Sequence, residues 1–321
     1  STRKDMGDEA GAKRELEASR VYYEGLLSQA PLDPRLEAQV RLHLVHSFLD
    51  LGRKTDALAA LDAAETAVVK EPSLASSIPE IRYTRIKLTG LEAKDPSAPV
   101  AALERIAFDF PQSQVAPLAL FDAAFLLERS GQLDRARAGY ESVAARYPRE
   151  AETAASALLR QAVLEDRLGA WDQAKSILES IPTKYPFTSA AAQAPMTAAE
   201  HYVKQHDTAG TKAALRRGVE IYQRMIAADS LGAGTPRLRW NLIRCYASLN
   251  DTPGTFRAVD AMVATSPTSN YAAMALLGGA KLAEDKKMRP KAAAYLNRFL
   301  QEFPNSPEAD RVRARLRELA K

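Results

Sequence analysis

A short apolar pattern recurs at fixed distances before a series of prolines, and this repetition constrains the fold more than any other feature of the chain. A large residue stands eight positions before the proline and an apolar residue five positions before it, as Tyr140 and Val143 do before Pro148. The same spacing precedes Pro31, Pro111, Pro186, Pro267 and Pro304. Residues three to five positions apart share one helix face. Each proline is therefore predicted to close an amphipathic helix, because proline cannot continue one.

A turn-forming residue stands seventeen positions before three of these prolines, at Gly131, Gly169 and Asn250. Each unit is thus predicted to contain a front helix, a short turn, a back helix and a closing proline. The closing prolines fall at 31, 72, 111, 148, 186, 236, 267 and 304. A period of this size predicts a solenoid of stacked helical pairs.

The spacing of Gly131, Ala136, Tyr140 and Pro148 resembles the tetratricopeptide repeat, although units of 37 to 38 residues exceed its usual period of about 34. HEAT repeats are the alternative. The resemblance implies an all-α, right-handed superhelix of about seven helical pairs with terminal capping helices. Units that end in Tyr-Pro or Phe-Pro are also similar to repeats of bacterial envelope proteins, such as the outer-membrane lipoprotein of the barrel-assembly machinery.

This reading divides the chain into an N-terminal helix, a repeat array and a C-terminal capping helix. The N-terminal part, 1–31, matches a back helix without its front helix, so we expect that an upstream segment, such as a membrane anchor or a lipidated leader, has been removed. The array, 32–304, has units at 32–72, 73–111, 112–148, 149–186, 187–235, 236–267 and 268–304, and the capping helix covers 305–321. Ser113, Ser269 and Ser306 are expected to cap the helices that follow them.

The composition argues for a folded, non-membrane chain without a disulfide framework. Of 321 residues, 46% are hydrophobic, yet no run of eighteen apolar residues occurs. Cys245 is the single cysteine, and its apolar helical context predicts a small buried residue.

A search for catalytic chemistry finds none. Nucleophile elbows, phosphate-binding loops, paired cysteines and dinucleotide fingerprints are absent from the sequence. His43 and His46 lie one helical turn apart, but no third ligand stands at a matching spacing, so a metal site is not expected. His201 and His206, five apart, do not form a site. We therefore expect no cofactor and no enzyme activity.

The resemblance places front helices along a concave groove, which makes their exposed residues candidates for partner binding. The candidates are Phe121, Phe125, His201, Lys204, Arg237, Trp240, Arg244 and Lys281. The stretch from position 204 to position 244 contains eight Lys or Arg residues and three Asp or Glu residues, whereas the net charge of the whole chain is only +4. Trp240 between Arg237 and Arg244 would make an anchor for an acidic or aromatic peptide. The alternative is that Trp240 packs between repeats and the arginines form a solvated face.

The function predicted from these features is a non-enzymatic scaffold that binds a partner peptide or helix, within a bacterial cell-envelope assembly or export complex. The location would be periplasmic or associated with the outer membrane, with the cytoplasm as the alternative. Other readings are a polysaccharide-export or cell-wall module and an adaptor domain of a larger regulatory protein. Nucleic acid is disfavoured because the basic excess is local and aromatic residues are few. The sequence leaves the oligomeric state open.

Overall fold

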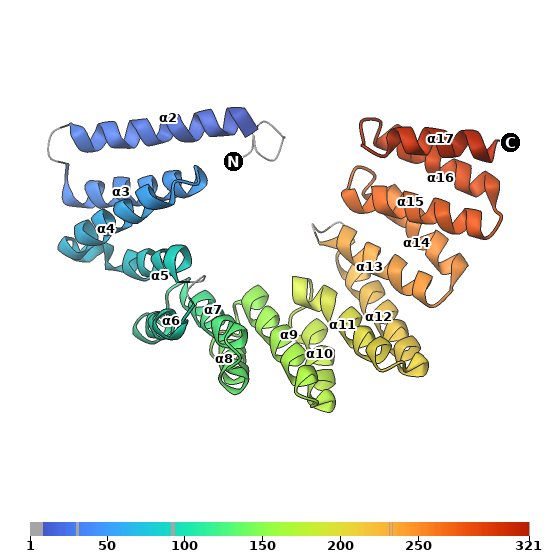
Figure 1. Cartoon of the computed structure of the whole chain (residues 1–321), viewed down its shortest axis with the longest axis horizontal. Coiled ribbons are helices and arrows are strands. Elements are labelled where there is room, and N and C mark those ends of the chain that lie inside the picture. Colours follow the sequence, from blue (N-terminus) through green and yellow to red (C-terminus); the bar gives the residue numbers. More distant parts are fainter. Residues whose placement is uncertain (1–8, 30–31, 91–93, 231, 233, 321) are drawn as a thin grey trace. The chain divides into compact units, whose positions relative to one another are not determined.

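The computed structural model describes residues 9–29, 32–90, 94–230, 232 and 234–320, and in these residues the chain is helical without any strand (Figure 1). The chain divides into two compact units at the border between Tyr147 and Pro148. No described helix is both long enough and apolar enough to cross a membrane.

Unit 1 stacks its helices in chain order, so each packs on the next. Its helices are α2 (Glu9–Ser28), α3 (Pro34–Asp50), α4 (Lys54–Lys70), a short 3-10 helix (Pro72–Ser77), α5 (Ile78–Thr89), α6 (Ser97–Asp109), α7 (Ala116–Arg129) and α8 (Leu133–Arg146). The pairs α3 with α4, α5 with α6 and α7 with α8 each join a front helix to a back helix.

Unit 2 repeats the same arrangement in its four helical pairs. Its helices are α9 (Ala151–Arg167), α10 (Trp171–Lys184), α11 (Ser189–Lys204), α12 (Thr208–Ala228), α13 (Thr235–Ser248), α14 (Thr252–Thr265), α15 (Asn270–Asp285), α16 (Arg289–Glu302) and α17 (Ala309–Leu319). Front helices also contact one another, because α11 packs on α9 and on α13, and α13 packs on α15. The front helices of unit 2 therefore form one continuous layer.

The residues that the proline pattern singled out are buried in the core of the repeats. Tyr140, Val143, Ile181 and Met262 have no solvent exposure, and Phe299 has 1%. The back helices α6, α8, α10, α14 and α16 each end two residues before their proline. The predicted helix ends and buried faces are therefore confirmed. They could be predicted because an apolar helix face and a proline that ends a helix are both local properties of the sequence. Pro31 lies outside the described residues.

The turns between front and back helices share one left-handed residue. Gly131 and Gly169 adopt φ of 78° and 83°, and Asn250 adopts 57°, as expected for turn formers. His206 and Lys287 occupy the equivalent position with φ of 56° and 58°. The residue after the left-handed one donates its N–H to the carbonyl five positions back, for example Gln132 to Leu127 at 2.9 Å and Met288 to Ala283 at 2.7 Å.

The predicted helix starts are confirmed at one of three serines. Oγ of Ser269 accepts the N–H of Ala272 at 3.1 Å and caps α15. The predictions for Ser113 and Ser306 are wrong, because α7 begins at Ala116 and α17 at Ala309. Neither helix has a side-chain cap, and Oγ of Ser306 instead accepts the N–H of Glu308 at 3.3 Å in the turn before α17.

The segment between α12 and α13 departs from the regular repeat. α12 has 21 residues and ends at Ala228, and Pro236 is the second residue of α13 rather than the end of a back helix. The 3-10 helix Pro72–Ser77 similarly fills the region where extra prolines weaken the pattern.

Candidate functional site

Three neighbouring front helices of unit 2 carry six of the eight predicted binding residues. His201 and Lys204 come from α11, Lys281 comes from α15, and α13 contributes Arg237, Trp240 and Arg244. α13 contacts both α11 and α15, so these residues belong to one layer of helices. Phe121 and Phe125 lie on α7 in unit 1 and are described with that unit.

Trp240 lies near the middle of α13. It is partly buried and packs against the apolar core that α14, α15 and α16 share. Arg237, one turn earlier, donates from Nη1 to Oγ of Ser189 at 3.1 Å, and Arg244, one turn later, is exposed. Trp240 thus packs on the core while staying partly exposed, with an arginine one turn away on either side along α13.

His201 lies in a cluster of side chains that sequence reasoning missed. Its Nδ1 is 2.5 Å from Oδ1 of Asp166, and its ring stacks on the indole of Trp171 with centroids 3.5 Å apart. Nε1 of Trp171 donates to Oη of Tyr202 at 3.3 Å. Only 12% of the His201 side chain is exposed. His201 therefore holds α9, α10 and α11 together.

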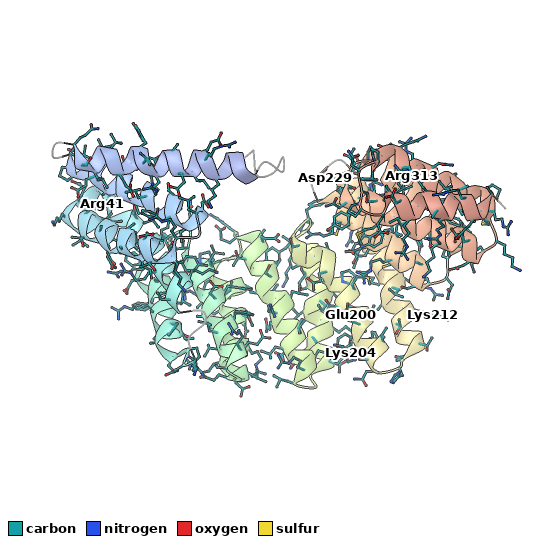
Figure 2. The ribbon with its side chains drawn as sticks, turned by 45° about the horizontal axis from the view of Figure 1, so that its top comes forward. Arg41, Glu200, Lys204, Lys212, Asp229 and Arg313 are labelled. Atoms are coloured by element: carbon teal, nitrogen blue, oxygen red, sulfur yellow. The ribbon has the colours of Figure 1, made fainter. Side chains whose placement is uncertain are left out.

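Lys204 is exposed at the end of α11, near Glu200 on the same helix, and Lys212 follows on α12 (Figure 2). The basic stretch is divided between two kinds of helix. Lys212, Arg216, Arg217 and Arg224 come from the back helix α12, whereas the other four basic residues come from the front helices α11 and α13. The positive charge is consequently not concentrated on the front layer alone.

Phe121 and Phe125 on α7 are both partly buried. The Phe121 ring lies 5.5 Å from that of Tyr140 on α8, and the Arg129 guanidinium lies 6.0 Å from the Phe125 ring. One turn of α7 separates the two, and between them Asp122 accepts a hydrogen bond from Tyr83 of α5 at 2.8 Å. These contacts bring α5, α7 and α8 together.

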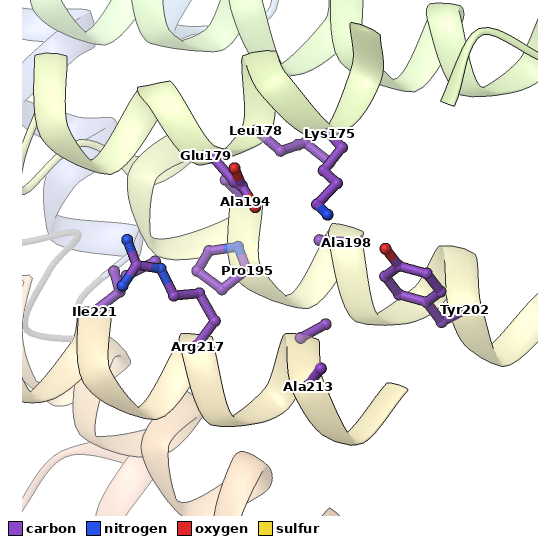
Figure 3. Close-up of a pocket in the computed structure, with 11 residues that line it drawn as sticks. Lys175, Leu178, Glu179, Ala194, Pro195, Ala198, Tyr202, Ala213, Arg217 and Ile221 are labelled. Carbon is purple, nitrogen blue, oxygen red and sulfur yellow. The ribbon is translucent and has the colours of Figure 1, made fainter. Parts of the chain in front are cut away.

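An apolar cavity of about 250 Å³ lies between α10, α11 and α12 (Figure 3). Its lining includes Ala194, Pro195 and Ala198 of α11, together with Lys175 of α10 and Arg217 of α12. None of the eight predicted binding residues lines it.

The cysteine and the two N-terminal histidines each have contacts of their own. Burial raises the pKa of the Cys245 thiol to about 12, so this cysteine is protonated at neutral pH. It is buried, as predicted, with Sγ 3.7 Å from Sδ of Met196. His43 stacks on Tyr23, and Nε2 of His46 lies 3.7 Å from Glu80. Within the part of the chain that the structure describes, no three metal-ligating side chains form a group.

Comparison with known proteins identifies the repeat. Residues 118–149, 156–188 and 274–306 match the tetratricopeptide repeat model. The repeats in these three stretches are of the tetratricopeptide type. The matched stretches fall on three helical pairs, α7 with α8, α9 with α10 and α15 with α16.

Several solved structures are similar to this chain. Yeast Tom70 is 11% identical, with a TM-score of 0.50 over 98% of this chain and 60% of that chain. BtubC from P. vanneervenii is 17% identical, with a TM-score of 0.45 over 69% of this chain and 89% of that one. A tetratricopeptide repeat protein from Parabacteroides merdae is 13% identical, with a TM-score of 0.39 over 88% and 99% of the two chains. No curated protein sequence matches this chain.

Proposed function

We propose that this protein is a non-enzymatic scaffold that binds a peptide or helix of a protein partner on the front helices of unit 2. Its tetratricopeptide repeats support an interaction role. The observation that carries the proposal is Trp240, which is partly buried and stands between Arg237 and Arg244 on α13. Trp and Arg are the residue types most often found at the energetic centre of interfaces.

The partner segment that fits this surface carries acidic and aromatic side chains. The exposed part of Trp240 offers apolar contact, and a carboxylate can form a bidentate pair with the exposed guanidinium of Arg244. Tryptophan already packed on the core loses little conformational freedom on binding. The ordered indole ring of Trp240 therefore favours tight binding of the partner segment.

Site-specific photo-crosslinking tests this function. A photoreactive amino acid at position 244 is expected to capture one protein partner, whereas the same group at position 224, on the back helix α12, is not. Mass spectrometry of the product identifies the crosslinked segment. Trp240→Ala should weaken capture of that partner at least about tenfold, the effect of about 1.4 kcal/mol. Equal crosslinking at both positions would contradict the front-layer site.

We further propose that the partner belongs to a bacterial cell-envelope assembly or export complex and that the protein acts in the periplasm or at the outer membrane. This setting rests on the similarity of the Tyr-Pro and Phe-Pro repeat endings to those of envelope proteins. Fractionation of the source cells, with antibody detection of the untagged protein, tests it. Recovery in the cytoplasmic fraction alone would overturn the envelope setting and leave the scaffold proposal intact.

A further inference from the structure

A polar cavity of about 600 Å³ lies at the C-terminal end of unit 2, among α15, the start of α16 and α17. Its charged lining comes from all three helices. Lys281 and Glu284 belong to α15, Arg289 opens α16, and Arg311, Arg315 and Glu318 belong to α17. Four cations against two carboxylates leave a surplus of two positive charges in the lining.

Among the described residues, only one of the four cations in the lining pairs with a carboxylate of the lining. Arg315 donates to Oε2 of Glu284 at 2.6 Å, which fixes its guanidinium between α15 and α17. Arg311 lies 3.6 Å from Glu308, which is not part of the lining. Within the described residues, Lys281 and Arg289 have no ion-pair partner, and both are exposed. Like charges gathered in a concavity repel one another, so an anionic ligand would gain from all of them.

Glu284 provides a second indication of the ligand. Its other carboxylate oxygen, Oε1, is buried and accepts no hydrogen bond from any described residue. A buried acceptor without a donor is costly. A ligand that brings both carboxylates and N–H groups, as a peptide does, matches the cations and this oxygen together.

The remaining lining favours a peptide over a nucleic acid. Ala314 and Leu319 complete the wall, and no aromatic side chain lines the cavity. Single-stranded nucleic acids are held by bases that stack on aromatic rings as well as by charge. An acidic peptide needs only cations and a small apolar surface.

We propose that this cavity binds an acidic segment of the partner peptide, with carboxylates at Lys281, Arg289 and Arg311. The inference rests on the proposed function, because α15 contacts α13, the helix that carries Trp240. A peptide lying across the front helices would contact Trp240 with one part and place its acidic part in the terminal cavity. The cavity thereby determines which end of the partner segment lies at α17.

Fluorescence anisotropy with a labelled, end-capped hexaglutamate peptide at low salt tests the cavity. The wild-type protein should bind it, and the variant Arg289→Glu/Arg311→Glu should bind at least about tenfold more weakly, since two attractive charges become repulsive. The matched control Arg216→Glu/Arg224→Glu makes the same charge change on the exposed face of α12 and should retain binding. Unchanged circular dichroism and thermal midpoint confirm that each variant is folded.

The outcomes separate this proposal from the partner site at Trp240. Trp240→Ala should retain hexaglutamate binding while it loses the crosslinked partner. Equal loss in both arginine double variants, or equal binding of hexaglutamine, would overturn the cavity proposal without affecting partner capture. Tighter binding of a labelled oligothymidylate that is lost in Arg289→Glu/Arg311→Glu would replace the peptide by a nucleic acid and also overturn it.

Discussion

The imidazole of His201 stacks on the indole of Trp171 with ring centroids 3.5 Å apart and planes parallel within 1°. The two residues come from α11 and α10, and Nδ1 of His201 is hydrogen-bonded to Oδ1 of Asp166 on α9. Thirty residues separate the stacked pair in the chain. One histidine thus connects three helices of two successive repeats.

Removal of this histidine is expected to destabilise unit 2. His201→Ala deletes the stacking contact and the hydrogen bond to Asp166, and should lower the free energy of unfolding by about 1–2 kcal/mol. Lys204→Ala, at an exposed position one turn later, should change it by less than about 0.5 kcal/mol. Urea denaturation followed by circular dichroism measures both. Equal effects of the two substitutions would show that the stacked cluster contributes nothing.

Substitutions at the left-handed turn residues should change stability in opposite directions. A residue other than glycine costs about 1–2 kcal/mol in this conformation, less for Asn or Asp. Lys287→Gly should therefore raise the free energy of unfolding by about 1 kcal/mol, whereas Gly131→Ala should lower it by a similar amount. A Cβ at Gly131 would meet no atom within 4 Å, so its cost would come from the backbone alone. Thermal denaturation of both variants measures the change in stability relative to wild type. A change in the same direction for both variants would contradict this explanation.

Two helical glycines should respond in opposite directions to alanine. A Cβ at Gly139 of α8 would lie 2.8 Å from Cβ of Ala124 on α7, so Gly139→Ala should force these helices apart and cost about 1–2 kcal/mol. Gly278 in α15 has no atom within 4 Å of the same position, and Gly278→Ala should stabilise by about 0.5–1 kcal/mol. Chemical denaturation curves test the pair. A stabilised Gly139→Ala would show that α7 and α8 do not pack this closely.

Glu65 of α4 predicts a dependence of stability on pH. Burial opposes ionisation, but hydrogen bonds from Arg82 and Arg85 outweigh it, so the pKa of the Glu65 carboxyl lies below its ordinary value of 4.5. The ionised form is therefore favoured by folding, and its contribution is present above pH 4.5 and lost as the pH falls through the lower, folded pKa.

Glu65→Gln should accordingly lower stability near neutral pH by about 0.5–1 kcal/mol, a figure that allows for solvent screening. The difference from wild type should shrink as the pH falls below 4.5. Urea midpoints across this range measure it. Glu71→Gln is the control, because Glu71 accepts the backbone N–H of Ser73 and forms no ion pair with an arginine among the described residues. A difference that stays constant with pH would contradict the role of ionisation.

The repeat architecture could be predicted because its determinants are local. Tyr140, Val143 and Pro148 identify one back helix by spacing alone, and Gly131 marks the turn before it. The capping rule failed where a backbone turn precedes the helix. Ser306 was expected as a cap, yet its carbonyl accepts the N–H of Ala309 and the helix starts later.

The candidate sites depended on contacts that no local spacing encodes. Trp171 could have been suspected only from its place just after the turn at Gly169, and nothing in the sequence paired it with His201. Arg289 and Arg311 likewise line one cavity with Lys281 only because α17 packs on α16 and reaches α15 through the ion pair of Arg315 with Glu284. The sequence by itself determined the helices, the turns and the apolar core, since these follow from periodicity along one chain segment. The tertiary structure alone decided which charged and aromatic side chains meet, because that depends on how successive helices pack against one another.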